Sequence, residues 1–178
     1  PTSRGATTLA EFLLQRLKII NAILALAPDI MGLTELENDR ITNSLSSSYG
    51  AASAIQDLVN GLNAAAPSGT TYAFVDAAAV DIVTDQIHCV FIYRTQTVQA
   101  VGMPVMLDSP YFNNLSRNPL AQTFREIATD QKLTVCLNHF RAKGSAATSA
   151  AATDNGTGSN ADPGDGQGTN NYLRVKEA

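Results

Sequence analysis

A long amphipathic segment that passes directly into a short apolar run constrains the fold of this chain most strongly. Apolar residues recur at helical spacing from Leu9 to Leu24, and Thr8–Glu11 has the pattern of a capping box. Pro28 ends this helix, predicted over residues 8–27, and Ile30–Leu33 then has the length and composition of a buried strand. A helix that feeds a buried strand predicts an α/β arrangement.

Carboxylates follow this predicted strand at once. Glu35 and Glu37 come within four residues of Leu33, and Asp39 follows. Side chains just beyond a buried strand lie at the carboxyl edge of an α/β sheet, where ligands commonly bind. Glu35 is therefore the first candidate for a functional acid. The alternative is an ordinary loop of solvated acids.

The middle of the chain predicts one more helix and five more strands. Apolar spacing from Ile55 to Leu62 indicates a helix over about residues 50–65. Runs rich in β-branched and aromatic residues indicate the strands, and 98–105 is expected to return as the hairpin partner of 87–94. The last two strands are expected to form an antiparallel hairpin. The predicted strands are Tyr72–Val75, Ile87–Arg94, Val98–Val105, Leu120–Ile127 and Lys132–Asn138.

The composition changes sharply at residues 144–168, which are rich in Ala, Ser, Thr, Asn, Asp and Gly. Such a segment is expected to form no core, which predicts a long mobile loop within a single domain spanning residues 1–178. Asn160, Asp162 and Asp165 suggest calcium, but their order matches no EF-hand because the bidentate glutamate is absent. Asn170 is placed to cap a final helix.

Global charge excludes a strongly basic nucleic-acid-binding protein. The net charge is −4 and 44% of residues are hydrophobic, which is typical of a soluble globular domain. A phosphate ligand would have to be held locally or through a metal. No apolar run approaches the roughly 18 residues of a membrane span. No protein partner can be identified from the sequence.

Only the composition and the cysteines of the sequence bear on the cellular compartment of the protein. The segment beginning Pro1–Arg4 lacks the features of a signal peptide, so a mature or trimmed protein is expected. Few Lys and many small polar residues fit an exported bacterial protein, secreted or at the cell surface. Cys89 and Cys136 each lie in a predicted strand. Two buried free thiols and one disulfide between neighbouring strands are both compatible with this placement.

Four polar sites share a position at or just beyond a strand end. They are Glu35, Asp85, Arg117 and the pair Asn138–His139. His88 instead lies within a strand and is expected to be structural or on the surface. A carboxylate able to hold Mg²⁺, a histidine that titrates near neutral pH and an arginine suit phosphoryl chemistry, in which a metal polarises the phosphoryl oxygen and cations neutralise its charge.

Six segments together resemble the endonuclease/exonuclease/phosphatase superfamily, the metal-dependent family of deoxyribonuclease I and of the exonuclease III type of repair nucleases. The match is strongest with secreted or surface-associated bacterial nucleases. The segments follow the family order over nearly the whole chain: 4–18, Pro28–Asn38, Asp85–Arg94, Arg117–Leu120, Asn138–Gly144, and Gly164–Gly168 followed by Arg174.

The resemblance implies a four-layer α/β sandwich of the deoxyribonuclease I type, with two mixed β-sheets flanked by helices. It implies that Glu35 is a metal ligand and that His139 contacts the scissile phosphate. Arg117 would lie close to the substrate backbone, and Asp85 would border the site. Asn138 would support the turn before the histidine. The two residues after Leu36, Glu37–Asn38, would support the site without binding metal.

The sequence departs from the family pattern in three places. A first strand with a metal-positioning asparagine, a later Gly-Asp-(Phe/Leu)-Asn-type motif and a final Asp-His pair do not occur, so the fold is expected to be incomplete at both ends. The resemblance implies a divalent-metal-dependent phosphodiester hydrolase, with Mg²⁺ expected and Mn²⁺ or Ca²⁺ as alternatives, most specifically an extracellular nuclease acting on DNA or RNA. The alternatives are a phosphatase, a sphingomyelinase-like phosphodiesterase, or a catalytically incompetent fragment or binding module.

Overall fold

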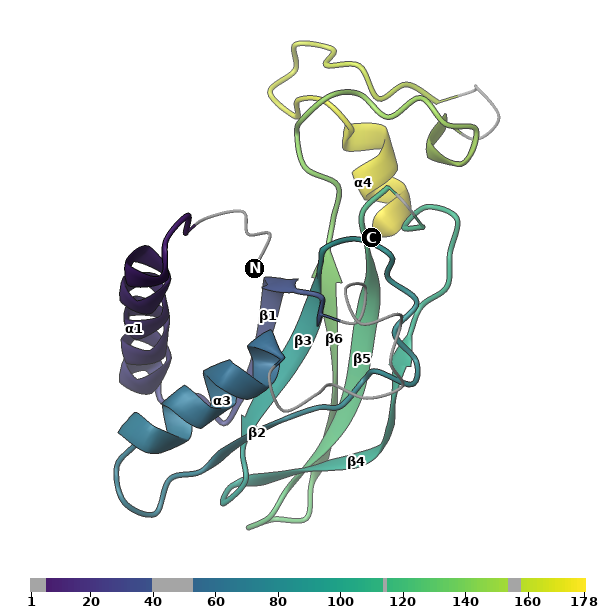
Figure 1. The fold of residues 1–178 in the computed structure, drawn as a ribbon. Coiled ribbons are helices and arrows are strands. Elements are labelled where there is room, and N and C mark those ends of the chain that lie inside the picture. The colour runs from purple at the N-terminus through teal and green to yellow at the C-terminus, as the bar shows by residue number, and fades with distance from the viewer. Residues whose placement is uncertain (1–5, 40–52, 114, 154–157) are drawn as a thin grey trace.

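The computed structural model describes residues 6–39, 53–113, 115–153 and 158–178 (Figure 1). Three helices and six strands make up most of this part of the chain, together with one short 3-10 helix, Ala151–Thr153. In chain order they are α1 (Leu9–Leu26), β1 (Ile30–Glu37), α3 (Ala54–Ala65), β2 (Tyr72–Phe74), β3 (Ile87–Arg94), β4 (Val98–Met106), β5 (Arg117–Glu126), β6 (Lys132–His139) and α4 (Asn171–Glu177).

Two three-stranded sheets stack on each other, and α1 and α3 cover the outer face of the first (Figure 1). The strand orders are β1-β3-β2 and β4-β5-β6. The fold is therefore α/β, as predicted. Every strand pair in the described residues is antiparallel, so the expectation of mixed sheets is wrong for this part of the chain. The described residues form a helical layer and two sheet layers, three of the four expected layers.

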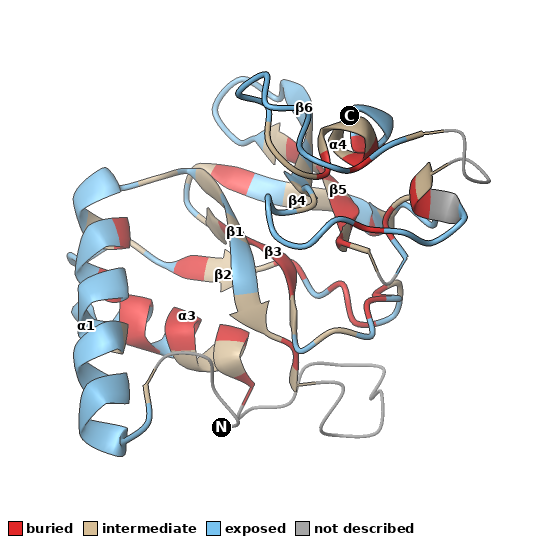
Figure 2. Cartoon of the chain, turned by 90° about the horizontal axis from the view of Figure 1, so that it is seen from above, coloured by how far each residue is buried: buried red, intermediate tan, exposed pale blue. Residues whose placement is uncertain are grey.

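Helix α1 begins where the sequence predicts. The Thr8 hydroxyl accepts from the Glu11 amide at 3.2 Å, and the Glu11 carboxylate accepts from the Thr8 amide at 3.1 Å, which confirms the capping box. Ile20 and Ile23 are the buried residues of α1, and they pack in the core shared with α3 and the first sheet. The rest of the helix is largely exposed (Figure 2).

Two apolar cores hold the layers together. The first lies between the helices and the first sheet and contains Leu62 and Ile92, both fully buried. The second lies between the sheets, where Phe91 of β3 meets Phe124 of β5 edge-to-face with ring centroids 5.7 Å apart. Successive residues of β3 therefore face opposite cores, and this alternation explains why β3 is buried on both faces.

The β5–β6 hairpin is confirmed, but the predicted partner of β4 is wrong. Strand β4 pairs with β5 and not with β3. The reason is that β3 is bonded to β1 on one side and to β2 on the other, so it has no free edge for β4. The chain crosses from the first sheet to the second at the turn between Arg94 and Val98, and β4 adds to the hairpin there.

The segment 144–168 takes part in a small core, contrary to the expectation that it forms none. Ala147 and Ala152 are buried with Leu173 of α4. The amide of Asn160 donates to the Ala147 and Ala152 carbonyls and accepts from the Leu173 amide, so it satisfies backbone groups that no strand or helix satisfies. The mobility of this segment remains a prediction.

Calcium at Asn160, Asp162 and Asp165 finds no support in the described contacts. The Asn160 side chain is buried and fully engaged with backbone groups. Asp162 and Asp165 each accept a hydrogen bond from the amide two residues ahead, which is a turn interaction. Asn170 precedes α4 as predicted, but its side chain bonds to the Ala142, Ser145 and Ala147 backbone and does not cap the helix.

Both cysteines are free thiols, which decides against the disulfide. Cys89 is buried between the sheets, and burial raises the pKa of its thiol to about 12. Cys136 is exposed on the outer face of β6. Within the described part of the chain, no helix has the length and apolar character needed to cross a membrane.

Candidate active site

A β-bulge in β1 aims the side chain of Glu35. Leu33 lies opposite Val90 and Leu36 lies opposite His88, so Thr34 and Glu35 together face a single residue of β3. Glu35 has a φ of 61°, an uncommon conformation for a residue other than glycine. Bulges turn a side chain away from the regular pleat and are frequent beside active sites. Glu35 therefore lies inside β1, at its bulge, and not beyond the strand end as predicted.

A second bulge, at the start of β5, places Arg117 beside His139. Leu120 pairs with Leu137 and Arg117 pairs with His139, so two residues of β5, including Pro119, face one residue of β6. In a regular ladder Asn118 would lie opposite His139. The additional residue puts Arg117 there instead, and directly opposed residues of antiparallel strands share a face. The bulge thus brings a guanidinium and an imidazole to the same face.

The imidazole of His139 bridges the two sheets. Its Nε2 lies 3.5 Å from Oε1 of Glu35, and its side chain is only 20% exposed against 68% for Glu35. Burial lowers the pKa of His139, the charge of Arg117 lowers it further, and Glu35 and Asp85 act in the opposite direction. The ring is therefore predominantly neutral at pH 7 and can donate one N–H.

Asp85 holds the guanidinium of Arg117. The two side chains approach to 2.5 Å, and the other Asp85 oxygen accepts from the Gln86 amide. Nε of Arg117 and Nδ1 of His139 are buried atoms without a hydrogen-bond partner in the described residues. Buried unsatisfied polar atoms are rare, and functional sites are one of their explanations. Glu35, Asp85, Arg117 and His139 thus form one cluster at one end of the sandwich.

Asn38 anchors the loop that carries Asp85. Its side chain is 2% exposed and donates to the Val83 and Asp85 carbonyls at 3.2 and 3.3 Å, while its backbone amide donates to Gln86. The geometry agrees with the supporting position that the resemblance implies for Asn38. Asn138, in contrast, is exposed on the outer face of β6, where its Oδ1 lies 4.0 Å from the Cys136 sulfur, and the structure does not bring it into the cluster.

A buried pair that the sequence does not indicate joins β3 to the segment that precedes it. Nδ1 of His88 is 2.8 Å from Oδ2 of Asp81, and their side chains are 1% and 0% exposed. The other Asp81 oxygen accepts from the Val83 amide at 2.9 Å. His88 is therefore buried, in agreement with a structural role. Asp81 is a polar residue between apolar neighbours in the sequence, which is the signal that could have indicated a buried partner for a strand histidine.

The side chains of the cluster could hold Mg²⁺ only in a site with few protein ligands. Within the described ranges, no group of three or more His, Cys, Asp and Glu side chains is arranged to hold a metal. Mg²⁺ usually keeps several waters and takes one or two carboxylates together with substrate phosphate. The exposed carboxylate of Glu35 matches that requirement. Asp85 matches it less well, because both of its oxygens already accept hydrogen bonds.

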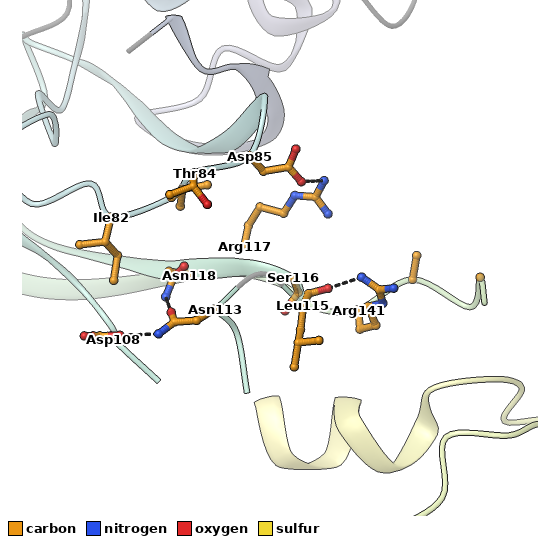
Figure 3. Close-up of a pocket in the computed structure, with 13 residues that line it drawn as sticks. Ile82, Thr84, Asp85, Asp108, Asn113, Leu115, Ser116, Arg117, Asn118 and Arg141 are labelled. Atoms are coloured by element: carbon orange, nitrogen blue, oxygen red, sulfur yellow. Dashed lines mark hydrogen bonds and ion pairs between the residues drawn. The ribbon is translucent and has the colours of Figure 1, made fainter. Parts of the chain in front are cut away.

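A pocket of about 730 Å³ opens beside the cluster (Figure 3). Asp85 and Arg117 line one part of it. On another wall, Asn118 donates to Asn113 and Asn113 donates to Asp108, each at 2.7 Å. The size is in the range of small-molecule sites, and the polar lining is suited to a charged or hydrogen-bonding ligand.

No family model matches this sequence, and no curated protein matches it. Among solved structures, the chain is similar to ANGEL2, described as a 2′,3′-cyclic phosphatase, and to the human Nocturnin catalytic domain with bound sulfate anion. Each is 15% identical over the aligned part with a TM-score of 0.42.

The alignments cover 69% of this chain and 30% of ANGEL2, and 71% of this chain and 42% of the Nocturnin chain. The chain thus spans less than half the length of either structure.

Proposed function

We propose that this protein is a divalent-metal-dependent phosphodiester hydrolase, and most specifically a nuclease that acts on DNA or RNA outside the cell. One observation carries the proposal. A bulge in β1 brings Glu35 to the imidazole of His139, and a bulge in β5 places Arg117 directly opposite the same residue. A carboxylate, a neutral imidazole and a guanidinium within one cluster supply the metal-ligand, hydrogen-bond-donor and charge-neutralising groups that phosphoryl transfer requires.

Each residue of the cluster has a different chemical role. The neutral ring of His139 donates an N–H to a non-bridging phosphoryl oxygen as negative charge builds on it during in-line attack by water. The guanidinium of Arg117 neutralises the same charge, and Asp85 fixes its orientation through the 2.5 Å ion pair. Glu35 would hold the metal. When bound, Mg²⁺, or Mn²⁺ or Ca²⁺ in its place, supplies Lewis-acid polarisation of the phosphate.

Secretion or surface attachment in a bacterium is the compartment that we propose. The support is compositional: the chain is acidic, with a net charge of −4, and is rich in small polar residues. The net negative charge also supports contact with a polyanion through local cations or a bridging metal ion, because it gives no general attraction for nucleic acid.

A plasmid-nicking assay with Mg²⁺ or Mn²⁺ tests the function. We expect nicking by the protein, loss of nicking in excess EDTA, and a decrease of about 10³-fold in Glu35→Gln. Glu126→Gln is the matched control, since it removes an exposed carboxylate at the end of β5 remote from Arg117, and it should retain activity within about threefold. Inorganic phosphate release without nicking would assign a phosphatase.

Two further outcomes would contradict the proposal. Hydrolysis of sphingomyelin without nicking would assign a lipid phosphodiesterase. Absence of hydrolysis of every phosphoester substrate would leave the chain as a binding module or an incompetent fragment.

A further inference from the structure

The pocket beside the cluster extends from the proposed catalytic residues to a second arginine. Asp85 and Arg117 line one part of it, and Arg141 lines another (Figure 3). Arg141 comes two residues after His139, at the point where the chain leaves β6. The pocket therefore connects the Asp85–Arg117 pair with Arg141, and its size of about 730 Å³ leaves room for the part of a substrate that adjoins the reacting phosphate.

Arg141 differs from most other described arginines because its guanidinium makes no close ion pair, although its charge acts on the nearby Glu177 carboxylate. Four of them, Arg16, Arg94, Arg117 and Arg125, lie within 3 Å of an aspartate oxygen. Arg141 makes no ion pair within the part of the chain that is described. Its only hydrogen bond from the guanidinium there runs from Nη1 to the Leu115 carbonyl. Since a guanidinium has five donors, most of its capacity remains for a ligand.

A buried carboxylate fixes the backbone of Arg141. Oε2 of Glu177 accepts from the Arg141 amide at 2.7 Å, and Oε1 accepts from the hydroxyl of Ser116, the residue before Arg117. Glu177 is 5% exposed. It therefore connects both sides of the open end of the β5–β6 hairpin, just beyond the Arg117–His139 pair. Arg141 and Arg117 are held in a fixed relation before any substrate arrives, which is the preorganisation that precise recognition needs.

A guanidinium with open donors recognises a phosphate by two parallel hydrogen bonds. In a nucleic-acid strand the scissile phosphate has neighbouring phosphates along the backbone, whereas a phosphomonoester or a sphingomyelin headgroup has none. We propose that Arg141 binds a phosphate next to the scissile one, so that the substrate is a nucleic-acid strand. This inference rests on the proposed function and selects among its substrates. Asp108 on the far wall accepts a hydrogen bond from Asn113 and lies on the side away from Leu115, the residue that Arg141 contacts (Figure 3).

Steady-state kinetics on two substrates tests the inference. Thymidylyl-thymidine has a single phosphate, and a single-stranded oligothymidylate has several. For Arg141→Gln, which keeps a donor for the Leu115 carbonyl, we expect kcat/KM on the oligomer to fall about 10- to 100-fold, mainly through KM. On the single-phosphate substrate it should stay within about twofold. The slope of log kcat/KM against log salt for the oligomer should decrease by about 0.7.

Arg125→Gln is the matched control, because Arg125 lies at the other end of β5 and pairs with Asp130. It should leave both substrates unchanged. Equal losses of Arg141→Gln on both substrates, or no loss on either, would overturn the inference, as would hydrolysis of 4-nitrophenyl phosphate alone by the unmodified protein. If the unmodified protein hydrolyses neither these substrates nor uridylyl-uridine and oligouridylate, the proposed function fails. If the unmodified protein cleaves both substrates and Arg141→Gln changes kcat/KM equally on the two, only the inference fails.

Discussion

The two histidines of this chain lie in opposite environments, although each contacts a carboxylate. His88 and Asp81 are almost completely buried and 2.8 Å apart, whereas His139 and Glu35 are 3.5 Å apart, with Glu35 mostly exposed. A fully buried pair cannot reach a substrate and contributes to the stability of the fold. A pair at the open end of the sandwich contributes little to stability and can contact a ligand. Burial, more than residue type, separates a structural histidine from a chemical one.

Replacing each histidine should separate activity from stability most clearly. His139→Ala should lower the hydrolysis rate by about 10³-fold and change the free energy of unfolding by less than about 1 kcal/mol, because it removes a charge-stabilising donor from a partly exposed position. His88→Ala should instead lower stability by several kcal/mol, on the order of 3, with little effect on the rate per folded molecule. Urea titrations and rates corrected for the folded fraction check both. Similar stability losses in the two variants would break the comparison.

Carboxylates of a buried pair and of an exposed pair should show the same contrast in stability. Asp81→Ala leaves the His88 ring and the Val83 amide without their acceptor, so the free energy of unfolding should fall by about 3 kcal/mol. Asp130→Ala is the matched control, because Asp130 pairs with Arg125 at an exposed turn, and should change stability by less than about 0.5 kcal/mol. Equal losses in the two variants would show that burial is not the deciding difference.

Glu177 is a buried carboxylate near the site, and its pH dependence should differ from that of a stabilising ion pair. Burial raises the pKa of Glu177, so the folded protein binds its proton more tightly than the unfolded chain does. The free energy of unfolding should therefore decrease as pH rises from the ordinary value of 4.5 through the raised one. Glu177→Gln should abolish this decrease, as measured by urea titrations across that interval. A stability gain with rising pH that is lost in Glu177→Gln would contradict the account.

The two cysteines should differ only in their chemical reactivity, which is the smallest of the expected effects. Burial raises the pKa of Cys89 to about 12, so it should resist iodoacetamide at neutral pH, whereas the exposed Cys136 should react. Mass spectrometry of the native protein should show one modification and that of the unfolded protein two. Equal labelling of both thiols in the native state would show that the second core opens readily.

The sequence was sufficient for the features that depend on local pattern. The capping box of α1, the hairpin of β5 and β6 and the position of His139 at a strand end follow from short-range spacing. The pairing of β4 with β5 does not, because it depends on both edges of β3 already being bonded. The core formed by Ala147 and Ala152 could not be predicted either, since small residues give no apolar periodicity.

The cluster itself was only partly predictable. Residue types at strand ends pointed to Glu35, Asp85, Arg117 and His139, and the structure places these four together. The bulges that aim Glu35 and Arg117 have no sequence signature, because a positive φ at a glutamate is imposed by the surrounding sheet. The outward position of Asn138 follows from the alternation of side chains along β6. His139 faces inward, so its neighbour Asn138 faces outward.

The most direct test of the central claim is a double-mutant cycle on hydrolysis of a phosphodiester with Mg²⁺. If Glu35 and His139 act on one phosphate as a unit, Glu35→Gln and His139→Ala should each lower the rate by about 10³-fold, and the double variant should be lower than either by less than about tenfold. A double variant whose loss is the product of the two single losses, or a single variant at the unmodified rate, would contradict the account.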